Sequence, residues 1–273
     1  LAVDPADSQH LFAGTVSGGV EASTDGGVRW QTTDVRDGHV LALSITDEGT
    51  IYAGTAFNGV LASAKDRRTP KKAGDDSSKT KDANSHHFVE IAAAQLNAIH
   101  AQNVVGVTVD PLNSQHLILG TNDGGLLGST DGGGHWSDTG AGLLSRSPRK
   151  AGFNPLKPTE VWDGSFDGGG LYSSTDSGSH WTRHLFGSPS NYVWMSSIDP
   201  NSGTIYAGSK GEGVRRSRDG GATFTRIDGG LMPQARYITF DSSRPGKFFV
   251  ASIGGLWRSL DDGATFTKVA PQA

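Results

Sequence analysis

The sequence has no cysteine, which excludes disulfide bonds and thiolate chemistry. It also lacks any run of about 18 apolar residues, and no charged segment followed by an apolar stretch stands at its start, so we predict neither membrane insertion nor a signal peptide. Neither sign of charge dominates, because 24 basic and 28 acidic residues leave a formal net charge of −4. Such a chain offers no general attraction to nucleic acid, which we therefore do not expect as a partner.

Glycine, in contrast, is abundant. It supplies 39 of 273 residues without the period of collagen, which indicates many tight turns between short strands. The length suits one domain, because all-β barrels and propellers of this size commonly form a single unit.

A short pattern, Ser-x-Asp-x-Gly-x-x-aromatic, occurs five times. The copies are STDGGVRW at 23–30, STDGGGHW at 129–136, STDSGSHW at 174–181, SRDGGATF at 217–224 and SLDDGATF at 259–266. A sixth copy, SAKDRR, begins at Ser63, has lost the glycine and the aromatic residue, and is followed by a charged insertion. The successive serines lie 40, 66, 45, 43 and 42 residues apart. A repeat of about 40–50 residues is typical of β-propellers.

Each repeat contains the parts of a four-stranded antiparallel blade. An apolar run that ends at Asp-Pro or a relative predicts the innermost strand, because proline cannot donate a ladder hydrogen bond. We predict an all-β fold: a single β-propeller of six four-stranded antiparallel blades, or seven if a blade is missing before Leu1. The predicted blades span approximately 1–38, 39–101, 102–146, 147–190, 191–234 and 235–273, with a charged loop insertion at 66–85 in the second.

The aspartates of the repeated pattern are predicted to have a structural role. Each can accept backbone N–H bonds within a tight turn, next to glycines that can adopt positive φ. Five equivalent acids on separate blades cannot converge on one catalytic or metal site. These residues are Asp25, Asp131, Asp176, Asp219 and Asp261.

The repeated motif resembles the Asp-box, or BNR, repeat family. That family includes sialidases, two-propeller xyloglucan-cleaving glycoside hydrolases, sortilin-type receptors and photosystem II assembly factors. The resemblance covers nearly the whole chain and implies the propeller fold, but a shared scaffold does not fix the chemistry of its sites. The single-propeller assembly factors are the most similar in size.

In a propeller, ligands usually bind on the face that carries the turns between the second and third strands and the connections from each fourth strand to the next blade. We call this the loop face. Its residues mix carboxylates, amides, cations and aromatics, which suits hydrogen bonding to a carbohydrate or a polar protein loop. The predicted ligand-binding residues are His39, Asn58, Asn103, Asn122, Arg149, Tyr192, Lys210, Glu212, Arg236 and Tyr237.

Two aspartates on this face support an alternative function. The two-propeller hydrolases place a catalytic acid in a Thr-Asp-x-Gly-Gly type turn, and Asp123 in TNDGG and Asp167 in SFDGGG resemble it. Two such carboxylates on neighbouring blades would act as general acid and base. The competing interpretation is that each caps its own glycine turn.

The leading hypothesis is a noncatalytic binding or assembly-scaffold propeller that recognises a protein partner or polysaccharide through the loop face. The alternatives are a glycoside hydrolase acting on a β-glucan such as xyloglucan, and a structural subunit of a larger complex. We expect no cofactor and no metal site, because His86 and His87 lack the spacing of a zinc site and are expected to be exposed. The start at Leu1 instead of methionine favours export to a periplasmic, extracellular or lumenal compartment.

Overall fold

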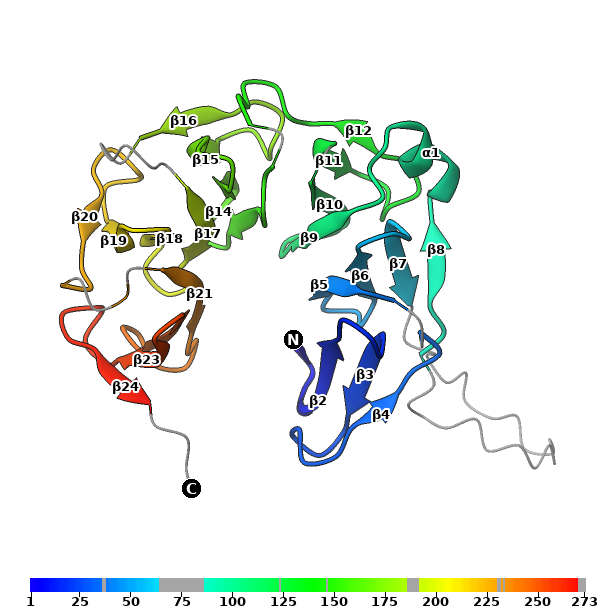
Figure 1. Ribbon diagram of the computed structural model, residues 1–273, viewed down its shortest axis with the longest axis horizontal. Helices are drawn as coiled ribbons and strands as arrows, with labels where there is room; N and C mark the ends of the chain where they lie inside the picture. Colours follow the sequence, from blue (N-terminus) through cyan, green and yellow to red (C-terminus); the bar gives the residue numbers. More distant parts are fainter. Residues whose placement is uncertain are drawn as a thin grey trace.

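The chain forms six separate four-stranded antiparallel sheets arranged in a ring (Figure 1). The computed structural model describes residues 1–35, 38–63, 86–122, 124–145, 147–185, 192–229, 232 and 234–269. Within each sheet the strands follow chain order, from the innermost strand at the axis to the outermost. The prediction of a six-bladed β-propeller is confirmed, whereas the charged insertion at 66–85 lies outside the described residues.

The blades are numbered in chain order. Blade 1 contains β1 (Ala2–Asp4), β2 (Asp7–Gly14), β3 (Val20–Ser23) and β4 (Gln31–Thr32), and blade 2 contains β5 (Val40–Ile45), β6 (Ile51–Thr55), β7 (Val60–Ser63) and β8 (Val89–Ile91). Blade 3 contains β9 (Val104–Asp110), β10 (Asn113–Thr121), β11 (Gly125–Ser129) and β12 (Ser137–Asp138). Blade 4 contains β13 (Gly152–Asn154), β14 (Lys157–Ser165), β15 (Gly170–Ser174) and β16 (Thr182–His184). Blade 5 contains β17 (Val193–Ile198), β18 (Ile205–Ser209), β19 (Gly213–Ser217) and β20 (Thr225–Arg226), and blade 6 contains β21 (Ala235–Phe240), β22 (Phe248–Ser252), β23 (Gly255–Ser259) and β24 (Thr267–Val269).

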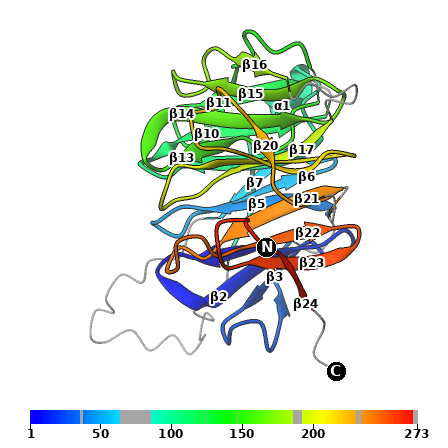
Figure 2. The same cartoon turned by 90° about the vertical axis from the view of Figure 1, so that its left-hand side faces the viewer.

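The hydrophobic core is divided among the junctions between neighbouring blades. Figure 1 shows the sheets side by side around the axis, so the inner strands of blades 2 to 5 have a neighbouring sheet on both faces, and Figure 2 gives the same sheets in side view. The second strands therefore read as short, nearly continuous runs of apolar and small residues, and every residue of β6 and β18 is buried. At the junction of blades 4 and 5, Trp162 and Leu171 pack against Val193 and Ile205.

A glycine in the second strand allows each blade to approach the next closely. In blades 1 to 5 a Cβ atom at this glycine would lie 2.5 to 2.8 Å from an atom of the following blade, in its innermost strand or, for Gly120, in Arg149 just before that strand. Only hydrogen leaves enough room at that distance. The glycines are Gly14, Gly54, Gly120, Gly164 and Gly208, and the equivalent residue in blade 6 is Ala251.

The ring is open between blade 6 and blade 1 (Figure 1). Among the described residues, extensive strand contacts join each blade to the next but do not join the sixth to the first. Five equivalent apolar residues, Val20, Val60, Leu126, Leu171 and Val214, are fully buried by the following blade. Their counterpart in blade 6, Leu256, is 41% exposed. The core is therefore built from five junctions.

The five copies of the repeated motif form the same turn between the third and fourth strands. Each serine hydroxyl donates to the aspartate Oδ1 at 2.7 to 2.9 Å, and that oxygen also accepts the backbone N–H four residues after the aspartate. The serine Oγ accepts the N–H of the glycine four residues after the serine in every copy. In the degenerate copy, the Oγ of Ser63 has no partner among the described residues. The aspartates thus bind their own turns.

These turns predict a loss of stability in acid. Hydrogen bonds from the Thr223 side chain and backbone and from Ser217 lower the pKa of Asp219 to about 2, and bonds from His180 and Ser174 lower that of Asp176 to about 2. A carboxyl group with a lowered folded-state pKa contributes stability that is complete above about pH 4 and is lost as the pH falls toward 2. We expect Asp219→Asn to reduce the pH dependence of unfolding in this window, measured by circular dichroism.

The matched control for this prediction is Asp138→Asn, an exposed aspartate outside the repeated motif. An equal change in pH dependence for both variants would show that the turn is not responsible.

Blade 2 departs from the pattern where the motif is degenerate. A short helix, α1 (Ala93–Ala98), follows β8 and buries Leu96 in the core between blades 2 and 3. Gln95 Oε1 accepts the backbone N–H of Trp136 at 3.0 Å, which ties the helix to blade 3. The expectation that His86 is exposed was wrong, because its ring is buried 4.9 Å from that of Phe12. His87 is exposed, and its Nδ1 lies 2.6 Å from Asp34 Oδ2.

Candidate functional site

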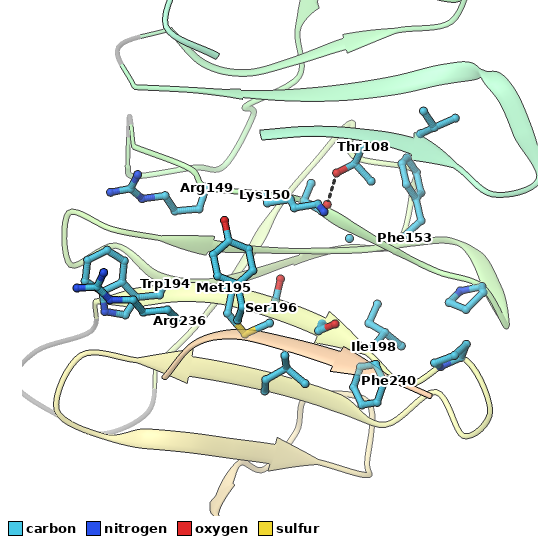
Figure 3. Close-up of a pocket in the computed structure, with 18 of the residues that line it drawn as sticks. Thr108, Arg149, Lys150, Phe153, Trp194, Met195, Ser196, Ile198, Arg236 and Phe240 are labelled. Atoms are coloured by element: carbon cyan, nitrogen blue, oxygen red, sulfur yellow. Dashed lines mark hydrogen bonds between the residues drawn. The ribbon is translucent and has the colours of Figure 1, made fainter. Parts of the chain in front are cut away.

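The innermost strands enclose a central cavity of about 660 Å³, which we call the channel. It is lined by residues of β9, β13, β17 and β21 and the segments that flank them, together with Leu41 of β5. Each of these strands starts at the loop face and ends at the opposite face, so the start and the end of the strands mark the two ends of the channel. Figure 3 shows that Arg149, Trp194 and Arg236 lie at one end and that Phe153, Ile198 and Phe240 lie at the other.

Cations and aromatic rings gather at the loop-face end, which we call the cationic end. The guanidinium carbon of Arg149 lies 4.1 Å from the centre of the Phe166 ring and 5.7 Å from that of Trp194. The guanidinium carbon of Arg236 lies 5.1 Å from the same Trp194 ring. Cations at such distances are attracted to the ring faces, so Trp194 holds two guanidinium groups close together. Lys150 and Tyr237 also line this end.

The backbone of Arg149 is fixed between blades. Its N–H donates to the carbonyl of Gly164 at 3.0 Å. Its carbonyl oxygen lies 2.6 Å from the position that a Cβ atom on Gly120 would occupy. The close contact between blades 3 and 4 therefore sets where this arginine enters the channel.

Burial affects the charged groups of the cationic end. Desolvation lowers the pKa of Arg149, and the charges of Tyr237 and Asp163 partly offset this. Desolvation also lowers the pKa of Lys150, whose side chain touches channel solvent but is surrounded by protein. Arginine stays protonated in proteins, so both guanidinium groups remain positive at neutral pH.

Behind this end lies a buried carboxyl group, that of Asp163 on β14. The residue is fully buried, and neither side-chain oxygen has a hydrogen-bond partner among the described residues. Desolvation raises the pKa of Asp163 well above its usual value, although the nearby backbone N–H of Arg149, which donates to Gly164 instead, and the positive charge of Arg149 oppose the shift. The carboxyl group therefore favours its neutral form and contributes little compensating charge.

The opposite end of the channel is apolar. Its lining includes the side chains of Phe153, Ile198 and Phe240 and the prolines Pro111, Pro155 and Pro200 that end three of the innermost strands. No Asp or Glu lines the channel in the part of the chain that the structure describes. The two ends thus differ in polarity: one is cationic and aromatic, and the other is apolar.

The predicted ligand-binding residues lie in several places. Arg149, Arg236 and Tyr237 line the channel, and Tyr192 and Lys210 lie beside it, with the Lys210 ammonium 5.5 Å from the Tyr192 ring. His39 and Asn58 line a separate cavity of about 470 Å³ between blades 1 and 2. The Asn122 N–H donates to the Asn103 carbonyl, and Glu212 pairs with Arg215 at 2.8 Å. The structure thus places three of these ten residues on the channel lining.

Asp167, one of the two aspartates considered for hydrolysis, does not line the channel. Asp167 Oδ1 accepts hydrogen bonds from the Ser165 hydroxyl at 2.5 Å and the Gly169 N–H at 3.1 Å, within its own turn. Asp123 lies outside the described residues. Among the described residues, no three His, Asp or Glu side chains form a group that could hold a metal ion.

Two aromatic residues of the cationic end were missed from the sequence. Trp194 lies two residues after the predicted Tyr192 and Phe166 lies directly before Asp167, and nothing in their local sequence marks them. Lys150, in contrast, was expected on the loop face beside Arg149. Asp163 does have a signal, because the aligned second strands carry Ala13, Ala53, Leu119 and Ala207 at its position. A single acid at a position that is otherwise small or apolar departs from the repeat, and such departures are expected at functional or strained sites.

Comparison with known proteins supports the fold. No protein-family model matches the chain, and no curated protein matches it. A GH74 xyloglucanase from Xanthomonas campestris is 15% identical with a TM-score of 0.74, and the match covers 99% of this chain and 45% of that one. YCF48 from Cyanidioschyzon merolae is 15% identical with a TM-score of 0.65, covering 98% of this chain and 83% of that one.

An extracellular domain of a one-component system from B. thetaiotaomicron is also similar, at 15% identity and a TM-score of 0.66, with 97% of this chain and 32% of that chain covered. The chain spans less than half the length of the GH74 structures that it matches. No helix among the described residues is long and apolar enough to cross a membrane. At these identities the likeness shows the fold alone: this chain is a β-propeller with six four-stranded blades.

Proposed function

We propose that this chain is an Asp-box type propeller that binds a ligand through its loop face without transforming it. The observation that carries this proposal is the make-up of the channel, where two arginines stand beside Trp194, Lys150 also lines the wall and no carboxylate of the described residues is present. Most glycoside hydrolases use two carboxyl groups on either side of the scissile bond, separated by roughly 5 to 9.5 Å. A cluster of cations and aromatic rings is instead suited to recognition.

Of the two ligand classes considered, a protein segment fits the channel better than a neutral glycan. A sugar exposes hydroxyl groups on every side, and each would need a polar partner when buried. Phe153, Ile198 and Phe240 and the three prolines offer no side-chain donor or acceptor at the apolar end. The hydroxyl of Thr108, which also lines the channel, already donates to the carbonyl of Ala151. A peptide with both charged and apolar side chains would match both ends.

The structural neighbours are consistent with either class. One is a YCF48 structure bound to D1 peptide, and another is a GH74 xyloglucanase. The hydrolase alternative would rest on Asp167 and Asp123, and the hydrogen bonds of Asp167 within its own turn do not favour it. The third alternative is a structural subunit of a larger complex. Such a subunit would contact its neighbours through the blade surfaces, so the channel does not support this alternative. We also infer that the chain is exported, and the extracellular domain among its structural neighbours is consistent with this.

The test is selection of ligands from a random peptide library and a glycan array. We expect the native chain to retain a set of peptides, and Arg149→Ala/Arg236→Ala to lose at least about tenfold in affinity, because hydrogen bonds to charged groups contribute about 1.5–3 kcal/mol. The matched control is Arg244→Ala, which removes an exposed arginine in the turn between β21 and β22, on the face opposite the loop face. Binding that falls equally in both variants would contradict the channel as the site.

Release of reducing sugar from β-glucans or xyloglucan by the native chain, abolished in Asp167→Asn, would replace the proposal with the hydrolase alternative.

A further inference from the structure

The channel has a direction that follows from how the innermost strands run. Residues at the start of each strand or just before it, Arg149, Trp194 and Arg236, lie at the loop face. Residues four positions further along, Phe153, Ile198 and Phe240, lie toward the opposite face (Figure 3). The volume of about 660 Å³ is within the roughly 300–1,000 Å³ range of ligand pockets. A ligand that fills it must therefore present different chemistry at its two ends.

The charge of the cationic end is not balanced within the described residues. No acidic residue lines the channel there, and the carboxyl group of Asp163 behind it is buried in an environment that favours the neutral form. The chain as a whole carries a formal charge of −4, so this concentration of positive charge is local. It attracts an anion.

Two N–H donors beside the cationic end also lack acceptors. Nε of Arg149 and Nε1 of Trp194 are buried and have no hydrogen-bond partner among the described residues. Leaving a buried donor unpaired is unfavourable. The flat guanidinium groups of Arg149 and Arg236 match the two oxygens of a carboxylate, which accept parallel hydrogen bonds from one arginine.

The apolar end selects the rest of the ligand. Its aromatic, aliphatic and proline side chains gain from covering an alkyl chain or an aromatic ring, at about 0.8 kcal/mol for each buried methylene group. A sulfate, a phosphate or a charged sugar alone would leave this end empty.

We propose that the channel binds an amphiphilic carboxylate, with the carboxylate at Arg149, Lys150 and Arg236 and an apolar chain or ring against Phe153, Ile198 and Phe240. The proposal rests on the proposed function, because it names the ligand class of the same site. Two sources share this chemistry: a free aliphatic or aromatic acid, and a peptide whose terminal carboxylate follows apolar residues.

The test is calorimetric titration of the full chain with hexanoate, octanoate and decanoate below their micelle concentrations. We expect Kd to fall about fourfold for each added methylene, because about 0.8 kcal/mol corresponds to that factor. 1-Octanol, which keeps the chain and lacks the charge, is expected to bind at least about tenfold more weakly than octanoate. A tripeptide ending in Phe with a free carboxylate, and the same tripeptide amidated, form the second arm.

The variants Arg149→Gln and Arg236→Gln are expected to weaken octanoate binding about 10- to 100-fold each, while Arg244→Gln on the opposite face leaves it unchanged. Binding of the free acids, or of the tripeptide only in its carboxylate form, supports the proposal and identifies the source.

An affinity that does not depend on chain length, or octanol binding as strong as that of octanoate, overturns the proposal. A third outcome separates the two proposals. If the arginine variants lose binding to library peptides, but the free acids do not bind and the free and amidated tripeptides bind equally, the proposed function stands and this inference fails.

Discussion

Replacing Gly208 with alanine is expected to lower the free energy of unfolding by about 1–3 kcal/mol, the usual cost of adding a methyl group to a packed interior. The new Cβ atom would lie 2.6 Å from the carbonyl oxygen of Ala235 and 3.1 Å from its carbonyl carbon. Both are backbone atoms of the next blade and cannot rotate away. The junction of blades 5 and 6 would have to open.

The measurement is the urea midpoint and the melting temperature, which should fall by about 2–10 °C for a domain of this size. The matched control is Ala251→Gly, the reverse change at the equivalent position of blade 6. That change should cost about 0.5–1 kcal/mol, from backbone entropy alone. If the two variants lose the same free energy of unfolding, the close approach of blades 5 and 6 is not the reason for glycine at position 208.

Replacing Asp163 with alanine is expected to raise stability at pH 7, by about 1–3 kcal/mol. The native residue buries a carboxyl group whose oxygens have no hydrogen-bond partner among the described residues, and an unpaired buried polar group costs about that amount. Alanine already occupies the equivalent positions at Ala53 and Ala207, and both are fully buried. The neighbouring blades thus show that the fold accepts the change.

The effect should depend on pH with a definite sign. Burial raises the pKa of Asp163 in the folded state, so between about pH 4 and that raised value the folded state holds a proton that the unfolded state has lost. Native stability therefore falls as the pH rises through this range, and Asp163→Ala should remove that part of the slope. Asp163→Asn is the control: it cannot ionise, but it keeps an unpaired polar group and should gain less.

Chemical denaturation at pH 4, 6 and 8 measures the slope. Two results would contradict this prediction. Either Asp163→Ala is less stable than the native chain, or the difference in their free energies of unfolding is the same at every pH. Both would show that Asp163 has partners that stabilise its charged form.

The fold could be predicted because it is repeated. Five copies of one turn motif, and Ser63 in the same phase, report the same local structure independently, so chance agreement in one copy does not matter. The helix at Ala93–Ala98 was not predicted, since it occurs in the blade whose motif is degenerate. The burial of His86 was missed because it depends on Phe12 in another blade, which no local pattern records.

The channel could be predicted only in part. Arg149, Arg236 and Tyr237 stand just before or at the start of innermost strands, and propeller geometry alone places such residues on the loop face. That Trp194 lies within 6 Å of two guanidinium groups depends on the rotation between blades and on side-chain packing. Both depend on contacts between residues far apart in the sequence, which the spacing of the repeat does not predict.

The open side of the ring has a consequence for how this chain unfolds. A closed ring has no ends, and every blade has two neighbours. With five junctions for six blades, blades 1 and 6 have one neighbour each, so the array behaves as a short linear chain whose stability is a sum of unit and neighbour contributions. Amide protons in β2 and β22 should then exchange before those of β10 and β14, with protection graded from the terminal blades toward blades 3 and 4.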